Sequence, residues 1–343
     1  MKYKLVGKTG LRVSELALGT MTFGEDWGFG ASREESKKQF DAFAEAGGNF
    51  IDSAINYTNG SSEKLVGEFI ASDRDRWVIA TKYSLNTRAD DPNAGGNQKK
   101  NMVRSIETSL KRLGTDHVDL YWVHFHDAFT PIEETMRALD DLVRSGKVLY
   151  VGISDAPAWI VSQANTLAEL RGWSPFVALQ IHWSLVERDV ERDLIPMAKA
   201  FGLAVTPWGV LGAGLLSGKY AGGKPPEDTK RASWTQNRLN DKNLATAALV
   251  GAIAKDIGAT SSQVAIAWVR QKYPNTIPIV GARKNEQLLE NLKSVDVTLT
   301  ADQMAKLDEA SKITLGFPHD FISSDSIRAI GYGSTFSKIV NHR

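Results

Sequence analysis

The 343-residue sequence contains no cysteine, so disulfide bonds, thiol nucleophiles and thiolate metal sites are excluded. It also contains no apolar run approaching the roughly 18 residues that a membrane span needs. Lys and Arg together number 41 and Asp and Glu number 40, giving a net charge of +1. That balance leaves no basic excess for binding nucleic acid or an anionic membrane. We therefore expect neither kind of partner.

The N-terminal residues, MKYKLVGKTG, include lysines where an export signal requires an apolar stretch, so we expect a cytoplasmic protein. Hydrophobic residues make up 42% of the chain, which is enough to bury a large core. No linker divides the sequence. We predict one domain over residues 1–343, in which the Gly- and Ser-rich stretch from about 311 to 343 forms a C-terminal tail or loop.

Short apolar runs alternate with amphipathic segments, a pattern typical of parallel strands joined by helices. Such connections are nearly always right-handed, and eight strand–helix units are the number that closes a (β/α)8 barrel. An open, doubly wound sheet is the alternative. The predicted strands are 16–20, 49–54, 77–82, 118–124, 148–154, 177–182, 203–208 and 276–281. The predicted helices are 32–47, 61–72, 97–114, 130–147, 156–171, 189–201, 242–257 and 285–293.

Three further segments complete the predicted architecture. YKLVGKTGLRVSEL, near the N-terminus, reads as a β-hairpin that could close the bottom of the barrel. The connections 83–96 and 217–241 are much longer than ordinary loops, and long loops in a compact domain are often functional. We expect both to lie over the C-terminal face.

Active sites of (β/α)8 barrels lie at the C-terminal ends of the strands. Four polar groups fall there: Asp52, Tyr57 just beyond it, Lys82 and His124. A free tyrosine is a weak acid, but an adjacent ammonium favours its phenolate, and a carboxylate beside the ammonium keeps that group charged. A neutral imidazole can donate a hydrogen bond to a carbonyl oxygen. Together these groups can polarise and protonate a C=O group, although each alone has an ordinary structural explanation.

His124 and His126 raise the alternative of a metal-dependent hydrolase. Residues two apart on a strand point to the same side, so the pair could share a site. A zinc site, however, needs additional His or carboxylate ligands, and the other histidines do not follow a ligand pattern. Because His126 lies beyond the strand end, we interpret it as a loop residue and expect no bound metal.

The motifs of the chain resemble, in order, those of the aldo-keto reductase family over about residues 4–310. FIDSAINYTNGSSEKLVGEF (50–69) is similar to the family's Asp, four residues, Tyr pattern, and IATK supplies a lysine at a similar spacing. DLYWVHFHD (119–127) looks like the family's Asp-Leu-Tyr-x-x-His segment, and this alignment selects His124 over His126. Further similar segments are LALGTMTFG (16–24), VGISD (151–155), LQIHWSL (179–185), TPWGVLGAGLLSGKY (206–220) and IPIVGARKNEQLLENL (277–292).

The resemblance implies an oxidoreductase that transfers hydride between NADPH/NADP+ and an aldehyde or ketone, or the reverse alcohol oxidation. Tyr57 would be the general acid, Lys82 and Asp52 would tune it, and His124 would orient the carbonyl. Ser154, Asp155 and Gln180 would hold the carboxamide, Trp208 would stack on the nicotinamide ring, and Arg283 would bind the ribose 2′-phosphate. The remaining implied cofactor residues are Gly19, Thr20, Met21, Asp52, Gly209, Val210, Leu211, Gly212, Gly214, Lys219, Gly281, Gln287, Glu290 and Asn291.

The sequence departs from the family pattern at four positions. Asp155 replaces the usual Asn, and Trp208 replaces Tyr or Phe. Thr58 and Asn59 stand where glycine often follows the tyrosine. The substrate pocket would include Trp27, Tyr57, His124 and Phe125. A cofactor-binding accessory subunit with little turnover is the second reading of the resemblance, and the substrate, the reaction direction and the choice between monomer and homo-oligomer stay open.

Overall fold

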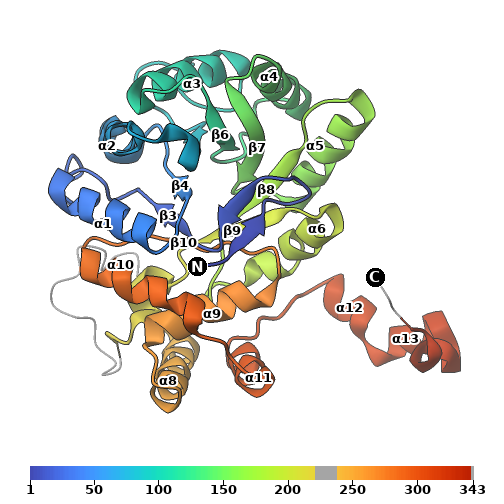
Figure 1. Cartoon of the computed structure of the whole chain (residues 1–343). Helices are drawn as coiled ribbons and strands as arrows, with labels where there is room; N and C mark the ends of the chain where they lie inside the picture. Colours follow the sequence, from blue (N-terminus) through green and yellow to red (C-terminus); the bar gives the residue numbers. More distant parts are fainter. Residues whose placement is uncertain (221–237, 341–343) are drawn as a thin grey trace.

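The computed structural model describes residues 1–220 and 238–340 and is built around one parallel barrel (Figure 1). Its eight strands are neighbours in the order β10-β3-β4-β5-β6-β7-β8-β9. An isolated parallel bridge between Val205 and Thr276 joins β9 to the segment that enters β10 and completes the ring. The strands are β3 (Ala17–Gly19), β4 (Phe50–Asp52), β5 (Val78–Tyr83), β6 (Val118–Val123), β7 (Val148–Ser154), β8 (Phe176–His182), β9 (Ala204–Trp208) and β10 (Ile279–Val280). The predicted (β/α)8 barrel is confirmed.

Helices surround this barrel, and their buried faces form the main hydrophobic core with the outer faces of the strands (Figure 1). None of the helices among the described residues is both long and apolar enough to cross a membrane. The helices of the barrel are α1 (Arg33–Glu45), α2 (Ser61–Ile70), α3 (Lys99–Leu113), α4 (Ile132–Arg144), α5 (Ala158–Arg171), α6 (Leu194–Phe201), α8 (Asp241–Asp256), α9 (Ser261–Lys272), α10 (Asn285–Leu292) and α11 (Ala301–Ala310).

The N-terminal hairpin, β1 (Tyr3–Leu5) and β2 (Arg12–Ser14), lies across one end of the barrel (Figure 1). Val6 and Val13, in and beside this hairpin, are buried in a second apolar cluster that fills the barrel interior. The same cluster contains Phe50 and Val78, the first residues of β4 and β5. The hairpin therefore closes the N-terminal end, as predicted, and the opposite end is left for the active site.

Helix α9 is not among the predicted helices: only one helix, at 242–257, is predicted between the last two strands, and the structure has two, α8 and α9. Thr260 caps α9: its hydroxyl accepts a hydrogen bond from the Gln263 N–H, and the Gln263 side chain accepts one from the Thr260 N–H. This reciprocal pair is a capping box. Eight of the twelve residues in α9 are buried, so the helix lacks the alternating polar face that reveals a helix in sequence.

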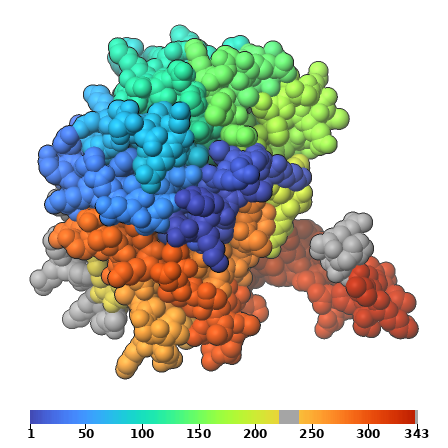
Figure 2. All heavy atoms as spheres, viewed as in Figure 1, coloured from blue at the N-terminus to red at the C-terminus, as the bar shows by residue number. Residues whose placement is uncertain are grey.

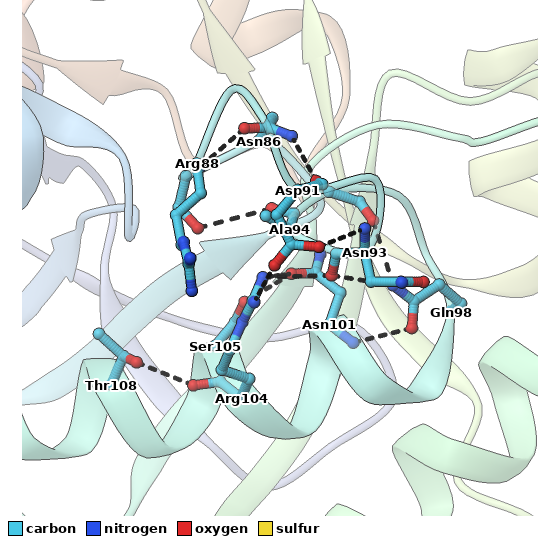
Figure 3. Close-up of polar contacts among 12 residues, drawn as sticks. Asn86, Arg88, Asp91, Asn93, Ala94, Gln98, Asn101, Arg104, Ser105 and Thr108 are labelled. Carbon is cyan, nitrogen blue, oxygen red and sulfur yellow. Dashed lines mark hydrogen bonds and ion pairs between the residues drawn. The ribbon is translucent and has the colours of Figure 1, made fainter.

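The long connection after β5 is folded against α3 (Figure 3). Arg104 of α3 forms an ion pair with Asp91 at 3.0 Å and donates a second hydrogen bond to the carbonyl of Asn93. At the end of this loop, the amide of Asn97 donates to the carbonyl of Phe125. The loop therefore supports the segment that follows β6 at the active-site rim. In the second long connection, predicted at 217–241, residues 221–237 lie outside the described part of the chain.

The segment after α11, predicted as a tail or loop, contains two short helices, α12 (His319–Ser323) and α13 (Asp325–Tyr332). The hydroxyl of Ser324 caps the second helix by accepting a hydrogen bond from the Ile327 N–H. This segment stands clear of the barrel (Figure 2). Its exposed apolar side chains are Phe317, Phe321, Ile322, Ile330, Tyr332, Phe336, Ile339 and Val340.

Candidate active site

Three of the predicted catalytic groups form one hydrogen-bonded chain at the C-terminal end of the barrel. The Lys82 ammonium lies 2.5 Å from a carboxylate oxygen of Asp52 and donates a further hydrogen bond to the Tyr57 hydroxyl at 3.1 Å. It also donates to the carbonyl of Ser53 at 2.7 Å. The strands bring these groups together because Asp52 ends β4, and Lys82 lies near the end of the neighbouring β5.

The backbone after Tyr57 turns through a left-handed conformation. Thr58 and Asn59 have φ of 43° and 53°, which explains why glycine is common at this point in the family pattern. Thr58 is fully buried, and its hydroxyl donates to the carbonyl of Phe23 at 2.6 Å and accepts from the Ser62 N–H. These two bonds hold the turn despite the unfavourable φ. The departure from glycine therefore leaves Tyr57 in contact with Lys82.

Burial dominates the electrostatics of Tyr57 and Lys82. Burial raises the pKa of Tyr57 more than the neighbouring Lys82 lowers it, so this pKa lies above its ordinary value. The sequence shows the neighbouring Lys82, which lowers this pKa, but not the burial that outweighs it. Burial by itself lowers the pKa of Lys82, but Asp52 and Tyr57 outweigh it, and that pKa is raised. At neutral pH the site therefore holds a charged ammonium beside a protonated phenol, the state required of a general acid.

His124 directly follows β6, and its ring lies against Tyr57 in a T-shaped arrangement with ring centroids 6.0 Å apart. Burial and the charge of Lys82 lower the pKa of His124 to about 3, so the imidazole is neutral. Its Nδ1 atom is buried without a hydrogen-bond partner in the described structure. His126 lies in the following loop, and its backbone N–H donates to the carbonyl of Asp155. Among residues 1–220 and 238–340, no group of three His, Asp or Glu side chains is placed to hold a metal ion.

Gln180 on β8 is bonded to the same chain of groups from across the barrel. Its amide nitrogen donates to the second carboxylate oxygen of Asp52 at 3.0 Å, and its side chain is nearly fully buried. Asp52 therefore accepts one bond from Lys82 and one from Gln180. The family resemblance implies only a cofactor role for Gln180, and the contact is not visible in sequence because the two residues are far apart and lie on strands that are not neighbours.

The ends of β7 and β9 carry the side chains predicted to surround a nicotinamide ring. Ser154 ends β7, and its hydroxyl is buried with no hydrogen-bond partner in the described parts of the chain. Trp208 ends β9, and its indole N–H donates to a carboxylate oxygen of Asp155 at 3.3 Å. One face of Trp208 stacks on His182, with ring centroids 4.2 Å apart and planes inclined by 5°. The exposed fraction of Trp208 is 36%, so part of this indole is available to a ligand.

A glycine-rich turn follows β9. Gly209 has φ of +67°, and a Cβ there would lie 2.7 Å from the ring of His182, so a larger residue does not fit. Gly212 and Gly214 also have positive φ and lie in a short 3-10 helix, η4 (Gly212–Ser217). Val210 and Leu211 connect the strand to this turn, and Lys219, just after it, is exposed.

Two of the predicted cofactor segments also have clear structural roles. The Thr20 hydroxyl donates to the carbonyl of Asp52, and Gly281 leaves room for the backbone of Gly19, whose carbonyl oxygen would lie 2.9 Å from an added Cβ. Met21, the next residue of this segment, is half-buried. The Glu290 carboxylate accepts from the Thr260 hydroxyl at the start of α9.

The segment predicted for the adenosine end begins at Arg283. Its backbone N–H donates to the Gln287 side chain, and its guanidinium makes no ion pair with any residue that the structure describes. Asn291 is buried on α10. Arg283 thus offers a half-buried planar cation at the start of this helix, suited to a phosphate group.

Aromatic side chains lie beside Tyr57. Trp27 meets the Tyr57 ring in a T-shaped contact with centroids 6.3 Å apart, and Phe29 lies next to Trp27 at 5.8 Å. The Trp27 indole N–H donates to Asn59 at 3.3 Å. Phe125 is half-buried immediately after His124. The predicted pocket residues Trp27, Tyr57 and His124 are therefore neighbours.

These observations define a class of protein: a barrel enzyme built to give a proton to a carbonyl oxygen. The groups along this rim also fit a nicotinamide dinucleotide. They are, in chain order, the buried hydroxyl of Ser154, the partly exposed indole of Trp208, the glycine-rich turn, Lys219 and Arg283.

Comparison with known proteins identifies the family. The sequence model of the aldo/keto reductase family matches residues 15–312. The chain is 38% identical to norsolorinic acid reductase of Aspergillus flavus over 93% of its length and 83% of that protein. It is 40% identical to aryl-alcohol dehydrogenase [NADP(+)] of Phanerodontia chrysosporium, covering 90% and 86% of the two chains, and 39% identical to an aryl-alcohol dehydrogenase of Pestalotiopsis microspora, covering 93% and 84%. The protein belongs to the aldo/keto reductase family and is an oxidoreductase that uses NADPH and NADP+.

Proposed function

We propose that this protein interconverts aromatic aldehydes or ketones and the corresponding aryl alcohols. The observation that carries the proposal is the hydrogen-bonded series from Asp52 through Lys82 to Tyr57, whose Tyr57 end lies against the aromatic ring of Trp27. These three residues supply a proton at the Tyr57 hydroxyl, and the Trp27 ring supplies an apolar surface next to it.

The protein's part of the reaction is to bind the carbonyl oxygen and protonate it. Tyr57 donates its phenolic proton to this oxygen, and the ammonium of Lys82 stabilises the phenolate that remains. Asp52 keeps Lys82 charged and oriented. His124, neutral because its pKa is about 3, donates a second hydrogen bond to the same oxygen. When the alcohol is oxidised, Tyr57 takes the proton back.

We assign the ends of β7, β8, β9 and β10, across the barrel mouth from Lys82, to the cofactor. When bound, NADPH supplies the hydride that completes the reduction. Ser154, Asp155 and Gln180 hold the carboxamide, and Trp208 supports the ring. The glycine-rich turn and Lys219 bind the pyrophosphate, and Arg283 binds the 2′-phosphate with Gln287, Glu290 and Asn291 near the adenine. Gly19, Thr20, Met21 and Gly281 border the same groove.

The aromatic substrate class is supported by the ring contacts of Trp27 with Tyr57 and Phe29. Flat rings gain about 0.5–1.5 kcal/mol from edge-to-face or offset contacts beyond their area burial. The names of two relatives, both aryl-alcohol dehydrogenases, point to the same class. A cytoplasmic location stays a prediction.

The test is NADPH consumption with benzaldehyde and with cyclohexanecarboxaldehyde, which match in ring size but differ in aromaticity. We expect kcat/KM to be about tenfold higher for benzaldehyde, and replacing Trp27 with Leu to remove most of that preference. Leu149→Ala, an exposed apolar residue at the opposite end of the barrel, is the control. Equal rates with both aldehydes would refute the aromatic preference.

Cofactor binding without turnover of any carbonyl compound would favour the accessory-subunit reading. Loss of activity on chelation would contradict a metal-free mechanism.

A further inference from the structure

Asp155 and Trp208, two departures from the family pattern, contact one another. The indole N–H of Trp208 can only donate, and an ionised carboxylate can only accept, so their 3.3 Å contact is complementary. A phenylalanine at position 208 would have no such donor. The contact fixes the edge of the indole, while the stack on His182 fixes one of its faces.

The backbone of Asp155 is also held in place. Its φ is +41°, a left-handed conformation, and its N–H donates to the carbonyl of Gln180 at 3.3 Å. Its own carbonyl accepts the N–H of His126. The carboxylate therefore projects from a constrained turn between β7 and α5, where it shares the rim with the exposed part of Trp208.

The titratable groups close to Asp155 and Trp208 differ in how their charges are paired. Asp52 and Lys82 form a buried ion pair and cancel one another. His124 and His182 are neutral, with pKa values lowered mainly by burial to about 3 and about 4. Tyr57 is protonated. Glu187 lies 3.8 Å from the His182 ring, and Lys219 and Arg283 are assigned to the cofactor phosphates. Asp155 forms no ion pair within the described residues, so its carboxylate is the unpaired negative charge in contact with Trp208.

We propose that Asp155 makes the site favour the oxidised cofactor, because its carboxylate, fixed against Trp208, stabilises the cationic nicotinamide of NADP+ more than the neutral ring of NADPH. The inference rests on the proposed function, in which Trp208 supports this ring. It goes further by giving Asp155 an effect on the balance between cofactor forms, which a neutral asparagine would not have. The hydride-transfer equilibrium on the protein would therefore shift toward carbonyl reduction, because bound NADP+ is stabilised relative to bound NADPH.

The size of the effect follows from removing one charge at a partly solvated site. Water and the nearby Lys82 reduce the attraction, so we expect the preference to change by about tenfold, equivalent to about 1.4 kcal/mol. Burial raises the pKa of Asp155, although Trp208 and Lys82 oppose that rise. Measurements are therefore made near pH 8, because high pH favours the ionised carboxylate.

The experiment measures the dissociation constants of NADP+ and NADPH by calorimetric titration, without substrate or turnover. Asp155→Asn removes the charge but keeps an oxygen that can accept from Trp208. We expect the Kd for NADP+ to rise about tenfold and the Kd for NADPH to stay within twofold. Trp208→Phe keeps the charge, so both affinities can fall while their ratio stays within about threefold of the parent. Asp73→Asn, which removes a charge before β5 at the other end of the barrel, should leave both constants unchanged.

Two results would overturn the inference. An unchanged ratio in Asp155→Asn would show that the charge does not act on the ring. Equal weakening of both cofactor forms would show that Asp155 has only a structural role. A parent protein that binds neither form would instead contradict the proposed function itself, and with it this inference.

Discussion

The two sides of the active-site rim differ in how their polar groups are satisfied. On the side of β4 and β5, Lys82 is hydrogen-bonded to both Asp52 and Tyr57; Asp52 and Lys82 are buried and Tyr57 is half-buried. On the side of β7 and β10, the Ser154 hydroxyl makes no hydrogen bond and the Arg283 guanidinium makes no ion pair within the described parts of the chain. The groups of the first side are therefore held in place before any ligand binds. The second side offers groups whose partners a ligand can supply.

The difference predicts that substitutions on the first side affect stability most strongly. Lys82→Met leaves the Asp52 carboxylate buried without its cation, which costs about 3–5 kcal/mol in the free energy of unfolding. Urea denaturation measures this loss. Lys99→Met, at an exposed ion pair with Asp141, should cost no more than about 1 kcal/mol.

A double substitution sharpens this result. Adding Asp52→Asn to Lys82→Met removes the orphaned charge, so we expect part of the lost stability to return. If the single Lys82→Met substitution destabilises the protein no more than Lys99→Met does, the buried pair is not the organising contact of the site.

A smaller effect is expected from the pH dependence of stability. The pKa of His124 falls from about 6.5 in the unfolded chain to about 3 in the folded one, so the unfolded state binds more protons between those values. Stability is therefore lost as pH falls below about 6.5. His124→Asn removes this contribution, which amounts to roughly 2–3 kcal/mol at pH 4.5.

Urea midpoints at pH 7 and pH 4.5 provide the comparison. The parent should lose more stability than His124→Asn on acidification, whereas Leu149→Ala, an exposed and uncharged position near the start of β7, should lose as much as the parent. An identical loss in all three proteins would mean that the His124 ring is not held neutral.

The smallest predicted effect lies on the cofactor side. Arg283→Ala should raise the Kd for NADPH about tenfold and leave that for NADH nearly unchanged, because only NADPH carries the 2′-phosphate. Stability should change by less than about 0.5 kcal/mol, since the guanidinium makes no ion pair in the described structure. Lys284→Ala, at the exposed neighbouring position, is the control. Equal weakening of both cofactors would contradict the 2′-phosphate assignment.

That Asp52, Tyr57, Lys82 and His124 lie together could be predicted from sequence, because each lies at or just after a strand end and parallel strands bring those ends together. The bond from Gln180 to Asp52 could not, because it crosses the barrel between strands that are not neighbours. The pKa of Tyr57 was misjudged in direction because sequence reveals the neighbouring Lys82 but not the depth of burial. The Asp155 and Trp208 departures were each visible, but their contact depends on the register of β7 and β9 around β8.

The central claim, that Tyr57 handles the proton while the opposite side binds the cofactor, is tested most directly by Tyr57→Phe. The measurement pairs kcat for NADPH-dependent benzaldehyde reduction with the Kd for NADPH. We predict that kcat falls at least about a hundredfold, the scale of lost general acid catalysis, while the Kd stays within twofold. A fall in kcat of less than about tenfold, or a Kd that rises in parallel with the loss of rate, would contradict it.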